Sequence, residues 1–318
     1  MRPPPPRQTE PKQSEDVAAE LSGDLTCAQC GYNLRGLSIR SSCPECGFAV
    51  GATIQLVVDP HAEKLRPVRW PRVTAWLLLI WAGGAMVAML LVMVMRGQDL
   101  VATVLGRTID HGLLPVAATG ALAISALGTV ALVRPLADLS WKRTVLAGVG
   151  VLAAVFAVVC FQSVMSIDRV MPNPFASTTP RGSPRPMASV GVMLAGVLWL
   201  LAVRVNYRAL LTRSLAMRTG RVDRQRLTPL IAALLVAAAG DSLMIVYQRF
   251  DVPDVLPFIA VAVIGLGSLL LAVGLANLTV DVVRLRPALI ARSKSMRDIL
   301  PGDAGDAGGG DAEVEPGA

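Results

Sequence analysis

The fold is decided by residues 73–95, which read VTAWLLLIWAGGAMVAMLLVMVM. This stretch has no charged residue, and a helix needs about 20 apolar residues to cross the ~30 Å hydrocarbon core of a bilayer. Five more apolar runs follow it, so we expect an all-α membrane protein with a six-helix transmembrane bundle at 73–283. The expected helices lie at about 73–95, 113–133, 144–165, 187–205, 229–247 and 256–280.

The composition supports this class. The chain of 318 residues is 53% hydrophobic and 17% charged, and its mean hydropathy is +0.55. Soluble domains are about 45–50% apolar and about 25% charged. The net charge of +7 is concentrated in segments between the apolar runs, which is typical of cytosolic loops and does not favour nucleic-acid binding. The arginine-rich stretch 204–226 is a candidate for contact with anionic lipid.

The orientation follows from the basic segments. They are the linker at 59–72, the loops at 134–143 and 206–228, and the tail that begins at 284. With six spans these segments fall on one side, which places both termini in the cytosol. Against this, the loop at 166–186 has a small basic excess on the opposite side, and one misassigned span would move the C-terminus outside. The lead at 1–23 and the tail from about 301 are expected to be disordered.

Four cysteines form two close pairs near the N-terminus. The pairs are Cys27-Ala-Gln-Cys30 and Cys43-Pro-Glu-Cys46, twelve residues apart. Two turns that each present two thiolates supply the four ligands of a tetrahedral metal site. A glycine follows each pair and permits a positive φ. A module as short as 24–58 cannot bury enough surface by itself, so we expect it to need the metal to fold.

The sequence around these cysteines resembles that of a known family of modules. CAQCGYNLRGL and CPECG resemble the short zinc ribbons at the N-termini of many bacterial polytopic membrane proteins of unknown function. The resemblance implies a small β zinc ribbon that holds one structural zinc through Cys27, Cys30, Cys43 and Cys46. It also implies the bacterial inner membrane. Iron of the rubredoxin type and a metal-free dithiol remain alternatives, and the run Ala52–Val58 looks like a short strand.

Asp241 interrupts the fifth apolar run. Counted from Pro229 at ~1.5 Å per residue, it lies ~18 Å into the membrane, past the midplane. A carboxylate at that depth is costly and is a functional candidate by default. The alternative is a structural aspartate bonded to Ser242, or to Gln162 or Ser163 of the third run. His61 and His111 are expected at the surface, and Asn277 and Asp281 at the membrane interface.

Two functions are compatible with these features, and no catalytic constellation points to an enzyme. The first is an integral membrane protein whose cytosolic zinc ribbon serves as an interaction or assembly module, with a protein partner bound through the ribbon. The ribbon offers no open coordination position for catalysis, because all four ligands are thiolates. Its charges (Asp24, Arg35, Arg40 and Glu45) cancel, which disfavours nucleic acid. The second is a small transporter or channel that uses Asp241.

Overall fold

The computed structural model describes residues 20–58, 68–136, 140–171, 175, 182–212, 227–250, 253, 255–290, 296 and 298–300. The chain divides into two compact units. The first joins residues 1–65 to residues 293–318, and the second spans residues 66–292. The lead at 1–19, most of the linker at 59–72, the arginine-rich segment from 213 to 226 and the tail from 301 lie outside the described residues.

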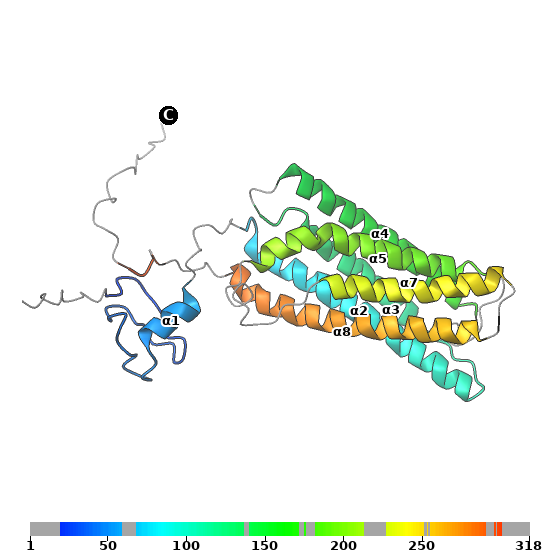
Figure 1. Ribbon diagram of the computed structural model, residues 1–318, viewed down its shortest axis with the longest axis horizontal. Helices are drawn as coiled ribbons and strands as arrows, with labels where there is room; N and C mark the ends of the chain where they lie inside the picture. The colour runs from blue at the N-terminus through cyan, green and yellow to red at the C-terminus, as the bar shows by residue number, and fades with distance from the viewer. Residues whose placement is uncertain are drawn as a thin grey trace, which may run out of the picture. The chain divides into compact units, whose positions relative to one another are not determined.

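The second unit is a bundle of apolar helices (Figure 1). Six described segments are long and apolar enough to cross a membrane. They are α2 (Pro71–Val104), α3 (Leu114–Gly128) with its 3-10 continuation η2 (Thr129–Leu132), α4 (Trp141–Asp168), α5 (Arg185–Leu211), α7 (Leu227–Arg249) and α8 (Leu256–Ile290).

The helices follow one another around a closed ring. Each one packs against the next along the chain, and α8 returns to pack against α2. Short connections between neighbours favour this antiparallel arrangement. The chain enters the bundle before α2 and leaves it after α8, so its two connections to the first unit lie at one end of the bundle. The opposite end of the bundle holds the ends of α2, α4 and α7 and the starts of α3, α5 and α8.

Small residues let the helices approach closely. A Cβ added to Gly128 would lie 2.5 Å from the backbone nitrogen of Trp81, and one added to Gly84 would lie 2.9 Å from the carbonyl oxygen of Ala121. The same holds between α7 and α8, where a Cβ on Gly267 would lie 2.6 Å from the backbone nitrogen of Ala237. In lipid, such close backbone packing holds helices together, because no hydrophobic drive acts between them.

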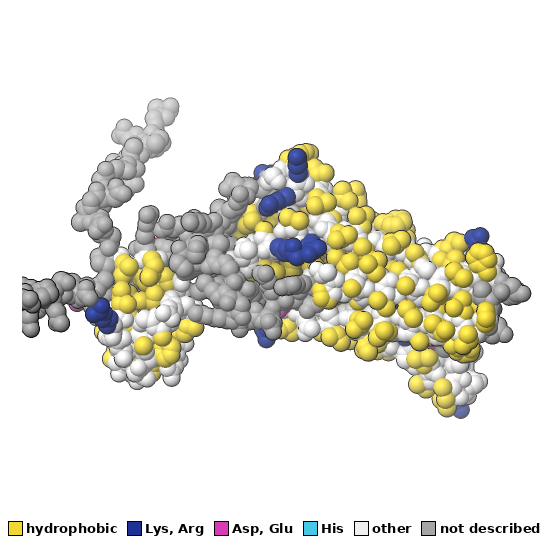
Figure 2. All heavy atoms as spheres, viewed as in Figure 1, with side chains coloured by type: hydrophobic (Ala, Val, Ile, Leu, Met, Phe, Trp, Pro, Cys, Tyr) yellow, Lys and Arg dark blue, Asp and Glu magenta, His cyan; other side chains and the backbone are white. Residues whose placement is uncertain are grey.

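The outside of the bundle is apolar. Hydrophobic side chains cover the face seen in Figure 2, and large ones such as Leu152, Phe156 and Leu127 are exposed. A soluble protein does not present a continuous apolar surface of this kind. Together with the six spanning segments, it identifies a multi-pass membrane protein.

The half of the bundle nearest the connections to the first unit is tightly packed. Leu78, Tyr207, Leu210, Leu278 and Leu285 are each at most 1% exposed. The ring of Trp81 meets that of Tyr207 edge to face, with 5.7 Å between the centroids. This core closes the middle of the bundle at that end.

Two helices end nine or ten residues later than the sequence indicated. The first was expected to end at residue 95, but α2 continues to Val104 and takes Arg96 and Asp99 into the bundle. The last was expected to end near residue 280, but α8 continues through Pro287 to Ile290. The expected helix ends were placed where the apolar runs stop. The helices continue beyond those points because polar side chains such as Arg96 and Asp99 find partners inside the bundle.

The first unit, which holds the four paired cysteines, is called the cysteine unit here. It differs from the predicted β ribbon. Residues 20–58 contain isolated bridges and no extended strand. The predicted strand Ala52–Val58 is wrong, because α1 (Val50–Val57) occupies it. Val50, Thr53 and Ile54 form the buried face of α1 at helical spacing. Packing against the module's core has overridden the strand preference of these β-branched residues.

The core of this unit takes a residue from the other end of the chain. Ile299 is fully buried and packs in one cluster with Leu21, Leu25, Leu34 and Val50. The module therefore begins before residue 24, and the C-terminal segment is part of it.

Candidate functional site

The four cysteines come together as the sequence predicted. All four sulfur atoms lie within 4.8 Å of one another. The Sγ atoms of Cys27 and Cys46 are 3.6 Å apart, as are those of Cys30 and Cys43. Four sulfurs at ~2.3 Å from one tetrahedral zinc would lie about 3.8 Å apart. The spacing fits a metal centre and is far too long for disulfide bonds.

Two matching turns position the sulfurs. In the first, the N–H of Gly31 donates to the carbonyl of Cys27, and the N–H of Cys27 donates to Tyr32. In the second, the N–H of Gly47 donates to the carbonyl of Cys43, and the N–H of Cys43 donates to the carbonyl of Phe48. Both glycines have positive φ, 79° and 71°, a conformation that favours glycine. The repeated Cys-x-x-Cys-Gly-aromatic wording thus folds into two copies of one turn.

The thiols favour a cation. The N–H groups of Cys30 and Gln29 donate hydrogen bonds that lower the pKa of Cys27 to about 6. The N–H of Phe48 lowers the pKa of Cys46, but desolvation and the three neighbouring sulfurs outweigh it and raise that pKa to about 12. Four thiolates at this spacing repel one another, so a bound cation is needed to hold them all ionised. Four sulfur ligands in this geometry fit zinc best.

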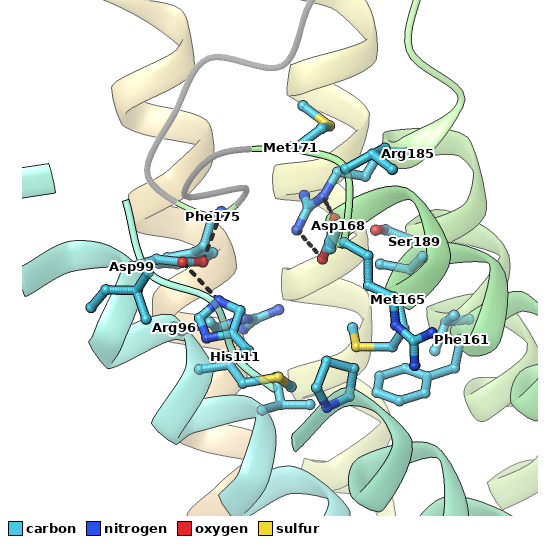
Figure 3. A pocket seen from close by; sticks show the side chains of 18 of the residues that line it. Arg96, Asp99, His111, Phe161, Met165, Asp168, Met171, Phe175, Arg185 and Ser189 are labelled. Atoms are coloured by element: carbon cyan, nitrogen blue, oxygen red, sulfur yellow. Dashed lines mark hydrogen bonds and ion pairs between the residues drawn. The ribbon is translucent and has the colours of Figure 1, made fainter. Parts of the chain in front are cut away.

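A second site lies in the bundle. A cavity of about 690 Å³, here called the chamber, is lined by residues of all six spanning helices and of the segment 108–112. Its polar side chains come mainly from the ends of α2 and α4 and the start of α5, so the chamber lies at the end of the bundle away from the cysteine unit's connections. Figure 3 shows these side chains converging from different helices.

Asp99 is fully paired within the chamber. Its Oδ1 lies 2.9 Å from Nε2 of His111, and its Oδ2 accepts the backbone N–H of Phe175 at 3.2 Å (Figure 3). The Nδ1 of His111 lies 3.0 Å from the Gln98 side-chain oxygen. Asp99 is only 2% exposed. This carboxylate therefore fixes the segment around His111 and the residue Phe175 against α2.

Asp168 and Arg185 form a two-pronged ion pair. Nε of Arg185 donates to Oδ1 of Asp168 at 2.5 Å, and a terminal nitrogen donates to Oδ2 at 3.2 Å (Figure 3). Both side chains are largely buried. The pair ties the end of α4 to the start of α5 and neutralises both charges.

Among the charged side chains of the chamber that are not exposed, Arg96 and Asp241 are left without an ion-pair partner among the described residues. Arg96 donates to the hydroxyl of Ser268, and its guanidinium lies 4.9 Å from the centre of the Phe175 ring. Asp241 is 4% exposed, lines the chamber, and forms neither a hydrogen bond nor an ion pair with a described residue. A buried carboxylate without a hydrogen-bond partner is costly, so Asp241 stays a candidate for a functional residue.

The described residues show no hydrogen bond between Asp241 and the partners that the sequence suggested for a structural role. Ser242 directs its hydroxyl to the carbonyl of Ala238, and Ser163 directs its hydroxyl to that of Val159. Gln162 is absent from the chamber lining.

Several residues of this site were missed in the sequence. Arg96, Asp99, Asp168 and Arg185 were counted as loop charges, and His111 was expected at the surface. Asp281, which was expected at the membrane interface, is 3% exposed within α8 and lies outside the chamber lining. The spacing of Arg96 and Asp99, three residues apart, places both on one helix face and was the available signal. His61 lies outside the described residues. Cys160 packs against Gly191 of the neighbouring helix.

Comparisons with known proteins give no further guide, because no family model, curated protein or solved structure matches the chain.

Proposed function

We propose that this chain is a multi-pass protein of the bacterial inner membrane that binds a small polar solute in the chamber, from the side opposite the cytosol. Both termini lie in the cytosol under this proposal, in keeping with the basic segments that flank the bundle. The proposal involves no catalytic step. Asp241 contacts the solute directly.

One observation carries the proposal. Asp241 is a buried carboxylate with no hydrogen-bond partner among the described residues, and it borders a cavity of about 690 Å³. Cavities of some 300–1,000 Å³ with a few convergent polar groups are the usual form of small-molecule sites. An unpaired carboxylate in such a place favours a ligand that donates hydrogen bonds and carries positive charge.

The packed half of the bundle favours a binding protein or transporter over an open channel. The core around Tyr207, Leu210 and Leu285 fills the bundle at the end away from the chamber. A solute held at Asp241 would need a rearrangement of these helices to go further.

The cysteine unit has a separate role in this proposal. It is a structural zinc module with Cys27, Cys30, Cys43 and Cys46 as ligands, and it serves interaction or assembly in the cytosol. Tyr32 and Leu56, both more than 40% exposed, offer contact points to a protein partner. Arg204 and Arg208 on α5, with the arginines that follow them, would contact anionic lipid.

Thermal unfolding of the purified protein tests the solute site. Phosphoethanolamine is the probe, because its ammonium group suits Asp241. We expect it to raise the unfolding temperature of the wild type, since a ligand that binds only the folded state stabilises it. The shift should disappear in Asp241→Asn and persist in the matched control Asp281→Asn, which changes a buried aspartate outside the chamber. A shift that survives Asp241→Asn, or its absence in the wild type, would contradict the proposal.

A further inference from the structure

A second cavity continues from the chamber into the bundle. It has a volume of about 170 Å³ and is called the slot here. The two cavities share five lining residues, which are Val92, Arg96, Phe161, Val192 and Met193. The chamber and the slot therefore adjoin each other.

The slot is narrow and apolar. Apart from the two indoles of Trp81 and Trp199, its only polar side chains are Arg96 and Ser268, which are bonded to each other. Its lining on α8 extends from Ser268 to Leu278, about 15 Å at ~1.5 Å per residue. A small volume spread over that length suits a single extended apolar chain, which would meet mainly apolar side chains there beyond Arg96 and Ser268.

The charged side chains of the chamber indicate which polar groups the ligand carries next to its apolar chain. Asp99 is paired with His111, and Asp168 with Arg185. Arg96 and Asp241 are the other chamber charges that are not exposed. Their opposite charges attract each other, but no direct ion pair joins them among the described residues. A ligand with one anionic and one cationic group would satisfy both side chains. Arg96 lies where the chamber meets the slot, so the anionic group is the one next to the apolar chain.

We propose that the ligand is a zwitterionic amphiphile, whose anionic group binds Arg96, whose ammonium group binds Asp241, and whose apolar chain enters the slot. This rests on the proposed solute site and adds the chemical class of the solute. Two sources carry this chemistry. One is a lipid of the outer leaflet with an ethanolamine phosphate head and a single chain. The other is a water-soluble amino acid with an apolar side chain.

The test uses the full-length protein in nanodiscs of phosphatidylglycerol, a lipid without an ammonium group. Bound molecules are counted by native mass spectrometry. The probes are lysophosphatidylethanolamine, lysophosphatidic acid, which lacks the ammonium group, phosphoethanolamine, which lacks the chain, and L-leucine. We expect lysophosphatidylethanolamine to bind about tenfold more tightly than lysophosphatidic acid, about 1.4 kcal/mol for one charge-assisted contact. Asp241→Asn should remove that preference.

Variants that fill the slot test the chain separately. Ala85→Phe and Leu122→Trp each place a larger side chain in the slot lining. We expect both to reduce lysophosphatidylethanolamine binding about tenfold while phosphoethanolamine binding is kept, and Leu127→Trp, on the exposed face of α3, to change neither. Tighter binding of L-leucine than of the lysolipid, with the same dependence on Asp241 and the slot, assigns the aqueous source.

Two results would overturn the inference. If the two lysolipids bind equally well, the ligand does not need an ammonium group. If both slot variants leave lysolipid binding unchanged, the apolar chain does not occupy the slot. In either case phosphoethanolamine binding that depends on Asp241 would leave the solute site standing. If phosphoethanolamine binding is also independent of Asp241, the solute site fails as well.

Discussion

The carbonyl oxygen of Ile299 accepts a hydrogen bond from the backbone N–H of Ser22 at 2.9 Å. It also accepts the N–H of Gly23 at 3.3 Å. Segments that precede the first spanning helix and follow the last one thus fold into one module. Both ends of the bundle must then emerge on the same side of the membrane, which requires an even number of crossings. This agrees with the six spanning helices and does not depend on the distribution of charge.

The shared module predicts that both termini lie on one side of the membrane, and the proposed orientation makes that side the cytosol. Tags fused at residue 1 and at residue 318 should be equally inaccessible to a protease added outside intact cells, and equally cleaved once the inner membrane is opened. Accessibility of one tag alone would contradict the contact between Ile299 and the cysteine unit.

Removing the buried side chain of Ile299 should weaken the cysteine unit. Ile299→Ala deletes a fully buried side chain, a change that costs about 2–5 kcal/mol in a protein core. We expect faster transfer of zinc to a chelator and faster tryptic cleavage of the C-terminal segment, whereas Met296→Ala, at an exposed residue, should behave as the wild type. Gly23→Ala should reproduce the effect, because its Cβ would lie 1.9 Å from the carbonyl oxygen of Asp298. Unchanged zinc release in both variants would show that the segment does not support the module.

Zinc should be present once per chain and should depend on the cysteines. Elemental analysis of the purified protein is expected to give one zinc, and Cys43→Ser should lose it without loss of membrane insertion, since the bundle is a separate unit. Cys160→Ser is the matched control and should retain the metal. Acid should release the zinc, because the thiolates must take up protons as the pH falls and metal affinity falls with them. Iron in place of zinc, or metal retained in Cys43→Ser, would contradict the assignment.

The ion pair between Asp168 and Arg185 should support the bundle. Arg185→Gln leaves a buried carboxylate without its partner, which costs about 3–5 kcal/mol when a buried pair is broken. We expect a lower unfolding temperature in detergent than for Arg169→Gln, which alters the exposed neighbour of Asp168. A double change to Asp168→Leu and Arg185→Met should recover part of the loss. Equal stability of Arg185→Gln and Arg169→Gln would show that the pair contributes little.

The sequence located the bundle and the metal ligands because both depend on local patterns. Apolar runs of helical length predict spanning helices, and two Cys-x-x-Cys turns predict a shared metal. The chamber depends on long-range pairing instead. Arg185 meets Asp168 across 17 positions, and Phe175 meets Asp99 across 76. No local pattern indicates such partners, so the charges were assigned to the loops that their low hydropathy suggested.

For Asp241, too, the local sequence predicted one part and long-range packing determined the other. Its depth in an apolar run identified it, but its surroundings did not follow from the run. The docking of Ile299 was equally hidden, because one isoleucine in a polar tail carries no signal of a core more than 240 positions away.

Chemical labelling of residue 241 from outside the cell shows whether Asp241 faces a chamber that opens to that side. Asp241→Cys is made in a Cys160→Ala background, and intact cells are treated with a membrane-impermeant thiol reagent that carries a quaternary ammonium group. The account predicts rapid labelling at residue 241, because the chamber is polar and lies at the end of the bundle opposite the cysteine unit's connections, and no labelling of Asp281→Cys in the same background. If residue 241 stays as unreactive as residue 281, Asp241 does not face a chamber open to that side, and the proposed solute site is contradicted.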